Sequence, residues 1–304
     1  MTQAVTRRPR RHLDGVLLFD KPIGWSSNAA LQKAKWLLRA EKAGHTGTLD
    51  PFASGLLPIC LGEATKFSQF LLNADKVYLA EVHLGVRTTT ADPEGEVIET
   101  RPVQVDAAAV LAVLPPFIGN ILQVPPMHSA LKRDGKPLYE YARRGETLDR
   151  AARPVVVHRI DLVALAGDRL TLRVHSGKGV YVRTLAEDIG AALGCGAHLA
   201  ALRREAVGPF RLADGCDLPT LEAATEAERD AWLLPADCLL GDLTRLDLDI
   251  DSADQFSHGQ AIWRSGLRVG AAYAVYAPDG RLLGVAEGDE DGKLAPKRLI
   301  ATRQ

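Results

Sequence analysis

Residues 44–55 read GHTGTLDPFASG and place one aspartate, Asp50, mainly among glycine, threonine, serine, proline and small apolar residues. The segment has neither the two-residue period of a strand nor the period of an amphipathic helix. Three glycines and a proline interrupt it, and such residues break regular structure. We therefore predict a tight loop built around Asp50.

An aspartate followed by proline also begins many helices, with Asp50 as the N-cap and Pro51 at the first helical position. A helix cap does not need Gly-His-Thr-Gly in front of it, whereas a loop that lets a bulky planar ligand approach the backbone does. The surrounding residues thus favour a ligand-binding loop over a cap. His45, taken alone, is expected to be a hydrogen-bonded loop histidine.

The composition indicates a soluble globular chain, with 46% hydrophobic and 25% charged residues. A length of 304 residues favours about two domains. No apolar run approaches the roughly 20 residues of a membrane span. The start, MTQAVTRRPRRH, lacks the apolar region of a signal peptide. We expect a cytoplasmic protein with no membrane partner.

The cysteines do not suggest a disulfide framework or a zinc knuckle, because Cys60, Cys195, Cys216 and Cys238 are scattered and form no CxxC pair. Cys195 and His198 have ligand-like spacing, but no second pair completes a four-ligand site. We expect no metal.

The net charge of −1 argues against a protein coated with basic groups for nonspecific nucleic-acid binding. A polyanionic partner must therefore be met locally. Each basic cluster has the alternative interpretation of a solvated face, and the N-terminal one of simple disorder. The clusters are Arg7, Arg8, Arg10 and Arg11; Lys132, Arg133 and Lys136; Arg143 and Arg144; and Arg203 and Arg204.

Apolar residues at helical spacing predict a helix over 26–40, which begins at a serine and leads into the Asp50 loop. Alternation predicts a strand over 77–86, with Tyr78 on its apolar face. The segment 88–97, TTTADPEGEV, has turn composition. Further strands are expected at 156–162 and 169–175.

Residues 176–184, SGKGVYVRT, are expected to continue a strand into a helix over 184–193. That helix would open with the capping-box pattern from Thr184 to Glu187 and stop before Gly194. The Ser-Gly-Lys-Gly start lacks the preceding glycine and the following serine or threonine of a phosphate-binding P-loop. We do not expect nucleoside triphosphate chemistry.

Residues 123–145 are rich in proline, lysine and arginine and predict an inserted arm with a short helix near 138–144. The alternative is an ordinary surface loop, although structureless loops of this length are uncommon unless functional or disordered. After an acidic helical segment, short alternating strands with Pro-Asp-Gly and Asp-Gly turns predict a small β-rich module. The expected division is a basic, disordered tail at 1–11, a catalytic domain at 12–244 with its insertion near 123–152, and the module at 245–304.

Asp50 needs orientation and a counter-charge to act as a nucleophile, because a free aspartate is already ionised at neutral pH. Arg183, expected at the end of the strand, has a guanidinium that can grip a carboxylate with two parallel hydrogen bonds. Tyr181 would share its face, and Tyr78 would offer an aromatic ring for stacking. The alternative for each tyrosine is core packing with a tethered hydroxyl.

Five segments in register resemble the TruB family of bacterial tRNA pseudouridine-55 synthases: GHTGTLDPFASG, KVYLAEV, TTTADPEGEV, PPMHSALKRDGKPLYEYARRG and SGKGVYVRTLAEDIGAALGCGAHLAALRR. The resemblance covers roughly 12–215, and a weaker similarity to a PUA-like RNA-binding module covers about 245–304. It implies an α+β fold, in which a mixed, mainly antiparallel sheet is flanked by helices and followed by a small C-terminal β-rich domain.

The resemblance also implies an activity: isomerisation of one uridine in the T-loop of tRNA to pseudouridine, by a monomer without cofactor, metal or protein partner. Asp50 would attack the flipped nucleotide so that the base detaches, rotates and reattaches through carbon. Tyr78 would stack on the target base and take part in proton removal, and Arg183 would pair with the aspartate. The implied substrate-binding residues are His45, Asp92, Tyr181, Leu202, Lys21, Pro22 and Lys132 of the arm.

One departure from the family pattern is Thr88-Thr89-Thr90, where Thr-Asp-Thr is usual. We expect a local change in hydrogen bonding rather than loss of activity. The basic arm and the aromatic Tyr78 suit an enzyme that must extract a base from its stack and hold the RNA backbone. Two alternatives are a synthase acting on another RNA uridine and a noncatalytic RNA-binding or RNA-folding protein.

Overall fold

The computed structural model describes residues 9–129 and 131–301, and its largest element is an 11-stranded sheet. The strands in chain order are β1 (Gly15–Lys21), β2 (Ala43–His45), β3 (Ser54–Leu61), β4 (Lys76–Leu84), β7 (Gly119–Gln123), β10 (Arg153–Ala166), β11 (Arg169–Ser176), β12 (Ala197–Val207), β13 (Phe210–Arg211), β14 (Cys216–Asp217) and β15 (Leu233–Leu234). They lie in the order β14-β1-β3-β12-β4-β11-β10-β7, with β2, β13 and β15 paired at its sides. Only the β1–β14 and β3–β12 pairs are parallel among those described. The predicted mixed, mainly antiparallel sheet is thus confirmed.

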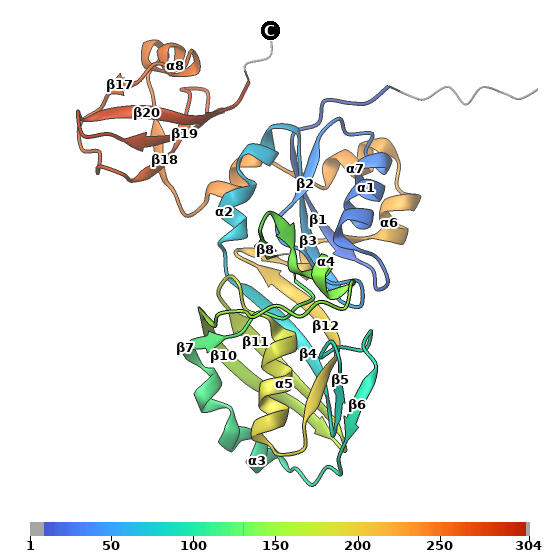
Figure 1. Ribbon diagram of the computed structural model, residues 1–304. Helices are drawn as coiled ribbons and strands as arrows, with labels where there is room; N and C mark the ends of the chain where they lie inside the picture. Colours follow the sequence, from blue (N-terminus) through green and yellow to red (C-terminus); the bar gives the residue numbers. More distant parts are fainter. Residues whose placement is uncertain (1–8, 130, 302–304) are drawn as a thin grey trace, which may run out of the picture.

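Helices flank this sheet in two groups (Figure 1). Helix α5 (Val182–Ala192) buries its apolar face against β4, β11 and β12, and α1 (Ser27–Leu37) packs on β1 and β3. Burial of these apolar faces is the main source of stability for both helices. The remaining helices are α2 (Ser68–Leu72), α3 (Ala107–Val113), α4 (Leu138–Ala142), α6 (Leu218–Ala223), α7 (Glu226–Ala231) and α8 (Ile250–Ser257).

The predicted helix over 26–40 is three residues too long at its C-terminal end. Ser26 caps it as expected, because its side chain accepts a hydrogen bond from the Ala29 N–H, but the helix ends at Leu37. Arg39 then adopts a positive φ of 56°, which turns the chain toward β2.

The predicted start of the second helix is wrong. Helix α5 begins at Val182 with Tyr181 as N-cap, so that Thr184 lies inside it and no capping box forms. Strand β11 ends at Ser176, which places Arg183 in the first helical turn rather than at a strand end. A distant residue fixes the backbone of the N-cap residue: the Gln123 side chain accepts from the Tyr181 N–H at 2.8 Å and donates to its carbonyl at 3.1 Å.

Strand β4 matches the predicted alternation, with Ala80, Val82 and Leu84 buried and Glu81 exposed. It stops at Leu84 because Gly85 has a φ of 79°, and a Cβ there would lie 2.6 Å from the Arg101 carbonyl oxygen. The turn expected over 88–97 joins two short strands, β5 (Val86–Thr88) and β6 (Val97–Thr100).

The basic arm leaves the main sheet after Gln123 and returns at Arg153, which pairs with Gln123. Between them lie the hairpin of β8 (Lys132–Arg133) and β9 (Lys136–Pro137) and then helix α4. Arg143 and Arg144 at the end of α4 are exposed, as expected for outward-facing basic side chains.

A second sheet of five strands has the order β16-β18-β19-β20-β17 and its own apolar core with α8. Its strands are β16 (Thr244–Asp247), β17 (Ile262–Trp263), β18 (Ala272–Tyr276), β19 (Leu282–Gly288) and β20 (Lys293–Leu299). It is joined to the larger unit through Tyr276, whose hydroxyl donates to Asp237 at 3.2 Å, and through Leu299, whose carbonyl accepts from Lys66 at 2.8 Å. The expected boundary near 245 falls in β16.

Residues 1–8 of the expected basic tail lie outside the described residues. Arg11 is not a free tail residue, because its guanidinium pairs with Asp230 and Glu226 and its backbone bonds to Arg39. Among the described residues, no helix is long and apolar enough to cross a bilayer.

Candidate active site

The Asp50 loop spans residues 46–53 between the paired strands β2 and β3. No helix follows Asp50, so the helix-cap alternative is wrong: its carbonyl accepts from the Ala53 N–H at 3.1 Å and closes a turn with Pro51 second. Ser27 anchors the loop by accepting from the Leu49 N–H at 2.7 Å and donating to the Leu49 carbonyl at 2.9 Å. The aspartate is therefore held at a fixed place above α1.

Arg183 links three groups rather than gripping one carboxylate. Its Nε lies 3.2 Å from Asp50 Oδ2, its Nη1 donates to Asp92 Oδ2 at 3.0 Å, and its Nη2 donates to the His128 carbonyl at 2.6 Å. The expected bidentate pairing with Asp50 is thus wrong, although the predicted partner is correct. The His128 contact ties the base of the arm to the site.

Asp50 is open to a ligand, since 37% of its side chain is exposed, whereas the Arg183 side chain is only 6% exposed. The protein around the carboxylate desolvates it and raises its pKa, while Arg183 opposes this rise and Asp92 adds to it. The site therefore has a reachable carboxylate with a fixed, buried counter-charge.

Asp92 is buried, with its side chain 3% exposed, and its oxygens are occupied. Oδ1 accepts from the Glu94 N–H at 3.0 Å and from the Thr90 hydroxyl, while Oδ2 faces Arg183. Asp92 binds Arg183 at a different nitrogen from the one that faces Asp50, so its position indicates that it orients the guanidinium. Thr89, at the departure from the family pattern, accepts from the Glu96 N–H at 3.1 Å and so helps to close the same turn.

Lys21 is fully buried and contacts the backbone of the Asp50 loop. Its ammonium donates to the carbonyls of Pro22, Trp25 and Pro51 at 2.9, 2.6 and 3.5 Å. Burial lowers its pKa to about 8, against the attraction of Asp50. Lys21 and Pro22 therefore lie beside the site, and Lys21 holds backbone rather than facing the opening.

Tyr78 lies half-buried on β4, directly across from Arg204 of β12, and its hydroxyl interacts with the Arg204 guanidinium. Arg204 is 1% exposed and donates Nε to the Leu56 carbonyl at 2.7 Å and Nη2 to the Gly47 carbonyl at 3.1 Å. Burial lowers the pKa of Arg204, and Tyr78 opposes that change. A buried cation thus lies between the Asp50 loop and Tyr78.

Arg204 is the main residue that the sequence interpretation missed, because it was grouped with Arg203 as a surface cluster. Successive residues of a strand point to opposite faces, so one of the two had to point inward. Arg203 remains partly exposed and donates to Asp20 at 2.6 Å. Glu94 was also missed: burial and the charges of Asp92 and Asp50 raise its pKa.

Arg204 also explains two features of the loop. A Cβ on Gly55, which has a φ of 104°, would lie 2.4 Å from the Arg204 carbonyl oxygen, so this glycine is required by strand packing rather than by a ligand. His45 is not the expected hydrogen-bonded histidine, because its buried Nδ1 has no partner among the described residues. Burial and then Arg204 lower the pKa of His45, which favours the neutral ring.

The other predicted residues lie in three different parts of the structure. Leu202 lies in the apolar core under α5, next to Ala80 of β4. Tyr181 is the N-cap residue of α5. Burial raises the pKa of its hydroxyl, Asp50 adds to this rise, and Arg183 opposes it. Lys132 is exposed on the β8–β9 hairpin, and no contact of its side chain with the Asp50 cluster is found within the described residues.

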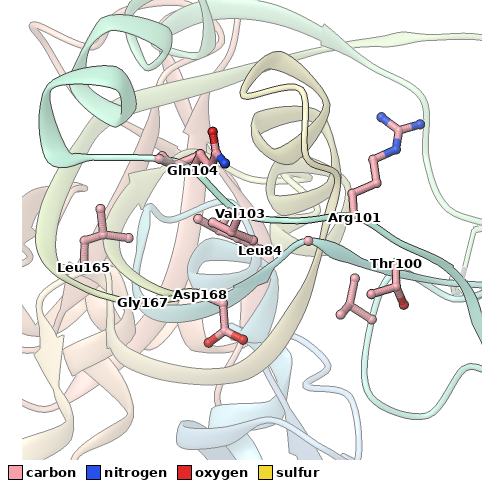
Figure 2. A pocket seen from close by; sticks show the side chains of 11 residues that line it. Leu84, Thr100, Arg101, Val103, Gln104, Leu165, Gly167 and Asp168 are labelled. Carbon is pink, nitrogen blue, oxygen red and sulfur yellow. The ribbon is translucent and has the colours of Figure 1, made fainter.

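A separate hollow of about 750 Å³ lies at the far end of the sheet (Figure 2). It is lined by the ends of β4, β6 and β10, with Leu84, Leu165 and Asp168 among its residues. Asp168 pairs there with His83 at 3.1 Å. Asp50 and Arg183 are not part of this hollow, so the paired charges of the loop remain the better candidate for chemistry.

The fold is that of a pseudouridylate synthase. Residues 35–182 match the family described as TruB family pseudouridylate synthase (N terminal domain), residues 183–241 the tRNA pseudouridylate synthase B C-terminal domain, and residues 244–300 the Pseudouridine synthase II TruB, C-terminal domain. The chain belongs to the TruB family, as the sequence resemblance predicted.

Relatives named tRNA pseudouridine synthase B cover almost the whole chain. The protein of Burkholderia mallei (strain ATCC 23344) is 58% identical over 97% of both chains. That of Ralstonia nicotianae is 55% identical over 97% of this chain and 96% of its own. Among solved structures, the archaeal box H/ACA sRNP Nop10-Cbf5 complex contains a similar chain, with a TM-score of 0.72, 26% identity, and coverage of 95% of this chain and 86% of that one.

Proposed function

We propose that this protein isomerises uridine 55 in the T-loop of tRNA to pseudouridine, and that it does so as a cytoplasmic monomer without a cofactor. The observation that carries the proposal is the Asp50–Arg183–Asp92 arrangement. An accessible carboxylate is aligned by a buried guanidinium, which is itself fixed by a second, buried carboxylate. The membership in the TruB family and the names of its relatives support the reaction type.

Asp50 is the proposed nucleophile. Arg183 lies against Oδ2, which keeps the carboxylate ionised in a partly desolvated place and fixes its direction. Attack on the flipped nucleotide breaks the bond between the sugar and the base nitrogen. The detached base rotates, and its carbon C5 displaces Asp50 from the sugar, which restores the free carboxylate. The proton on C5 then leaves, and the base nitrogen that was bound to the sugar takes up a proton.

Tyr78 is the proposed stacking surface for the extracted base and the group next to the C5 proton. Flipping a base costs a few kcal/mol of lost stacking, which contact with an aromatic face offsets in part. The buried Arg204 guanidinium contacts the Tyr78 hydroxyl and donates to the Gly47 carbonyl of the Asp50 loop. This contact between Tyr78 and the residue that holds the loop supports a role for Tyr78 in proton removal.

The arm would bind the tRNA backbone at a place outside the pocket. Lys132, Arg133, Lys136, Arg143 and Arg144 are exposed along it. Lysine and arginine contacts to phosphates position a nucleic acid without reading its sequence. The five-stranded C-terminal sheet is the proposed PUA-like RNA-binding domain, which would extend contact toward the acceptor arm.

A direct test uses a T-loop stem-loop RNA that carries tritium at uridine C5 and measures its release by the wild-type chain and by Asp50→Asn. We expect release from one uridine by the wild type and none above background by the variant, with unchanged RNA affinity because the amide keeps the shape. Release by Asp50→Asn near the wild-type rate would exclude the assignment. Release from other uridines would instead point to a synthase with a different target, and binding without any release to a noncatalytic RNA-binding protein.

A further inference from the structure

A cluster of two histidines and one aspartate lies on the face of the sheet opposite α5. Asp75 stands just before β4, His158 is on β10 and His175 is on β11. One side-chain ligand atom from each lies within 4.8 Å of the other two. We propose that Asp75, His158 and His175 form a binding site for one divalent transition-metal ion of the zinc type.

The spacing of the ligand atoms suits such an ion. His158 Nε2 lies 3.2 Å and His175 Nε2 lies 3.7 Å from Asp75 Oδ2. Ligands at about 2.0–2.1 Å from a tetrahedral zinc ion lie about 3.3 Å from one another, which falls between these two distances. The side chains need to move little to surround an ion.

A β-bulge brings His158 into the cluster. The register between β10 and β11 shifts between Val157 and Arg159, so His158 is the extra residue. Val157 and Ile160 both point into the core under α5, and His158 is left on the outer face beside His175. Bulges re-aim side chains in this way. Without the extra residue, strict alternation would turn part of this stretch to the wrong face.

The cluster is accessible, and among the described residues its side chains form no ion pair except with one another. The side chains of Asp75, His158 and His175 are 48%, 38% and 44% exposed, so water could complete the coordination. Two lysines next to the cluster in sequence or space, Lys76 and Lys178, carry positive charges that lower the affinity for a cation, but neither occupies the ligand atoms. Lys76 donates to the carbonyls of Leu72 and Ala74, and Lys178 to Asn73 Oδ1, so both ammonium groups are held by other acceptors.

The ligand set identifies the class of ion. Imidazole nitrogen with one carboxylate suits zinc, cobalt or nickel, whereas calcium and magnesium prefer oxygen ligands alone. Ligands from three separate segments would tie the residue before β4 to the interior of β10 and to the end of β11. Bound metal should therefore raise the thermal midpoint of unfolding. Among the described residues, none of the three ligands forms an ion pair with Asp50 or Arg183, and the proposal does not depend on the proposed catalytic role.

The test measures Zn²⁺ binding by calorimetry and Co²⁺ binding by visible absorption, on the full chain stripped of metal and carrying no histidine tag. We expect one ion per chain. His158→Ala, His175→Ala or Asp75→Asn should each weaken the affinity for the ion by about tenfold or more. The matched control is His83→Ala, which removes a histidine that also faces an aspartate on this sheet and should leave binding unchanged.

Three results would overturn the proposal. The first is a wild-type chain that takes up no Zn²⁺ at micromolar concentrations. The second is equal binding by the wild type and by a folded His158→Ala/His175→Ala variant. The third is a thiolate absorption band in the Co²⁺ complex, which would move the ion to a cysteine such as the partly exposed Cys238. Because wild-type uptake is decisive by itself, misfolding of a variant does not protect the proposal.

Discussion

Replacing Arg183 with lysine should be far from conservative, because the guanidinium donates to two groups and forms an ion pair with a third in a different direction. Asp50, Asp92 and the His128 carbonyl each face a different nitrogen. A lysine ammonium is a single point that keeps the charge but loses the planar fork. In Arg183→Lys at least one of these acceptors loses its partner.

The expected size follows from the burial of the acceptors. A hydrogen bond to a charged group contributes about 1.5–3 kcal/mol, and Asp92, with its side chain 3% exposed, has no access to bulk water in compensation. We expect the free energy of unfolding to fall by about 3 kcal/mol. If the alignment of Asp50 suffers by a similar amount in the transition state, the rate falls on the order of a hundredfold.

Urea unfolding measures the first effect, and tritium release under saturating RNA measures the second. The matched control is Arg203→Lys, an arginine of β12 whose side chain is 43% exposed and which pairs with Asp20. A partly exposed pair contributes about 0–1 kcal/mol, so the control should change little. Equal stability and equal rate of Arg183→Lys and Arg203→Lys would refute the three-acceptor argument.

Three further variants test other parts of the structure. Gly55→Ala should lower the free energy of unfolding by about 3 kcal/mol, because its Cβ would meet the Arg204 carbonyl, while Gly44→Ala, with open space around it, serves as control. Burial lowers the pKa of Lys76 to about 8 from 10.5. The unfolded chain therefore binds more protons between these values, and urea unfolding should show wild type gaining stability relative to Lys76→Met as pH rises through that window. Lys132→Ala should weaken tRNA binding modestly and lower the salt-dependence slope by about one, as measured by a filter-binding titration.

Each of these has a clear contrary outcome. Gly55→Ala as stable as Gly44→Ala would mean that β3 and β12 separate easily. A stability difference between wild type and Lys76→Met that does not change with pH would mean that Lys76 stays charged in the folded chain. An unchanged salt slope for Lys132→Ala would remove this residue from the RNA contact.

The parts of the fold that local pattern determines were predictable from the sequence. Alternation placed β4 within two residues, and Ser26 marked the start of α1. The start of α5 was not predictable in this way, because Gln123, 58 residues from Tyr181, holds the backbone of the N-cap residue. Local pattern favoured Thr184, and a tertiary contact decided otherwise.

The candidate site shows the same division. The loop motif identified Asp50, and residue chemistry, in agreement with the resemblance, indicated Arg183 and Tyr78. Neither indicated that one guanidinium serves two carboxylates. Arg204 looked like a surface charge because the burial of a strand face depends on neighbours that are distant in sequence. The Asp75 cluster was invisible for a related reason, since its members lie far apart along the chain and meet only through a bulge.

The pairing of three strands has a consequence for folding fidelity. Gly55 of β3, Arg204 of β12 and Tyr78 of β4 lie opposite one another in a single row across the sheet. A slip of β12 by one residue would turn Arg204 outward and bring Arg203 into the core. The pairing of Arg204 with Gly55 and with Tyr78, which positions both the loop and the tyrosine, would then be lost in a single step. A misaligned chain is thus expected to be inactive rather than partly active, so that catalysis reports correct strand assembly.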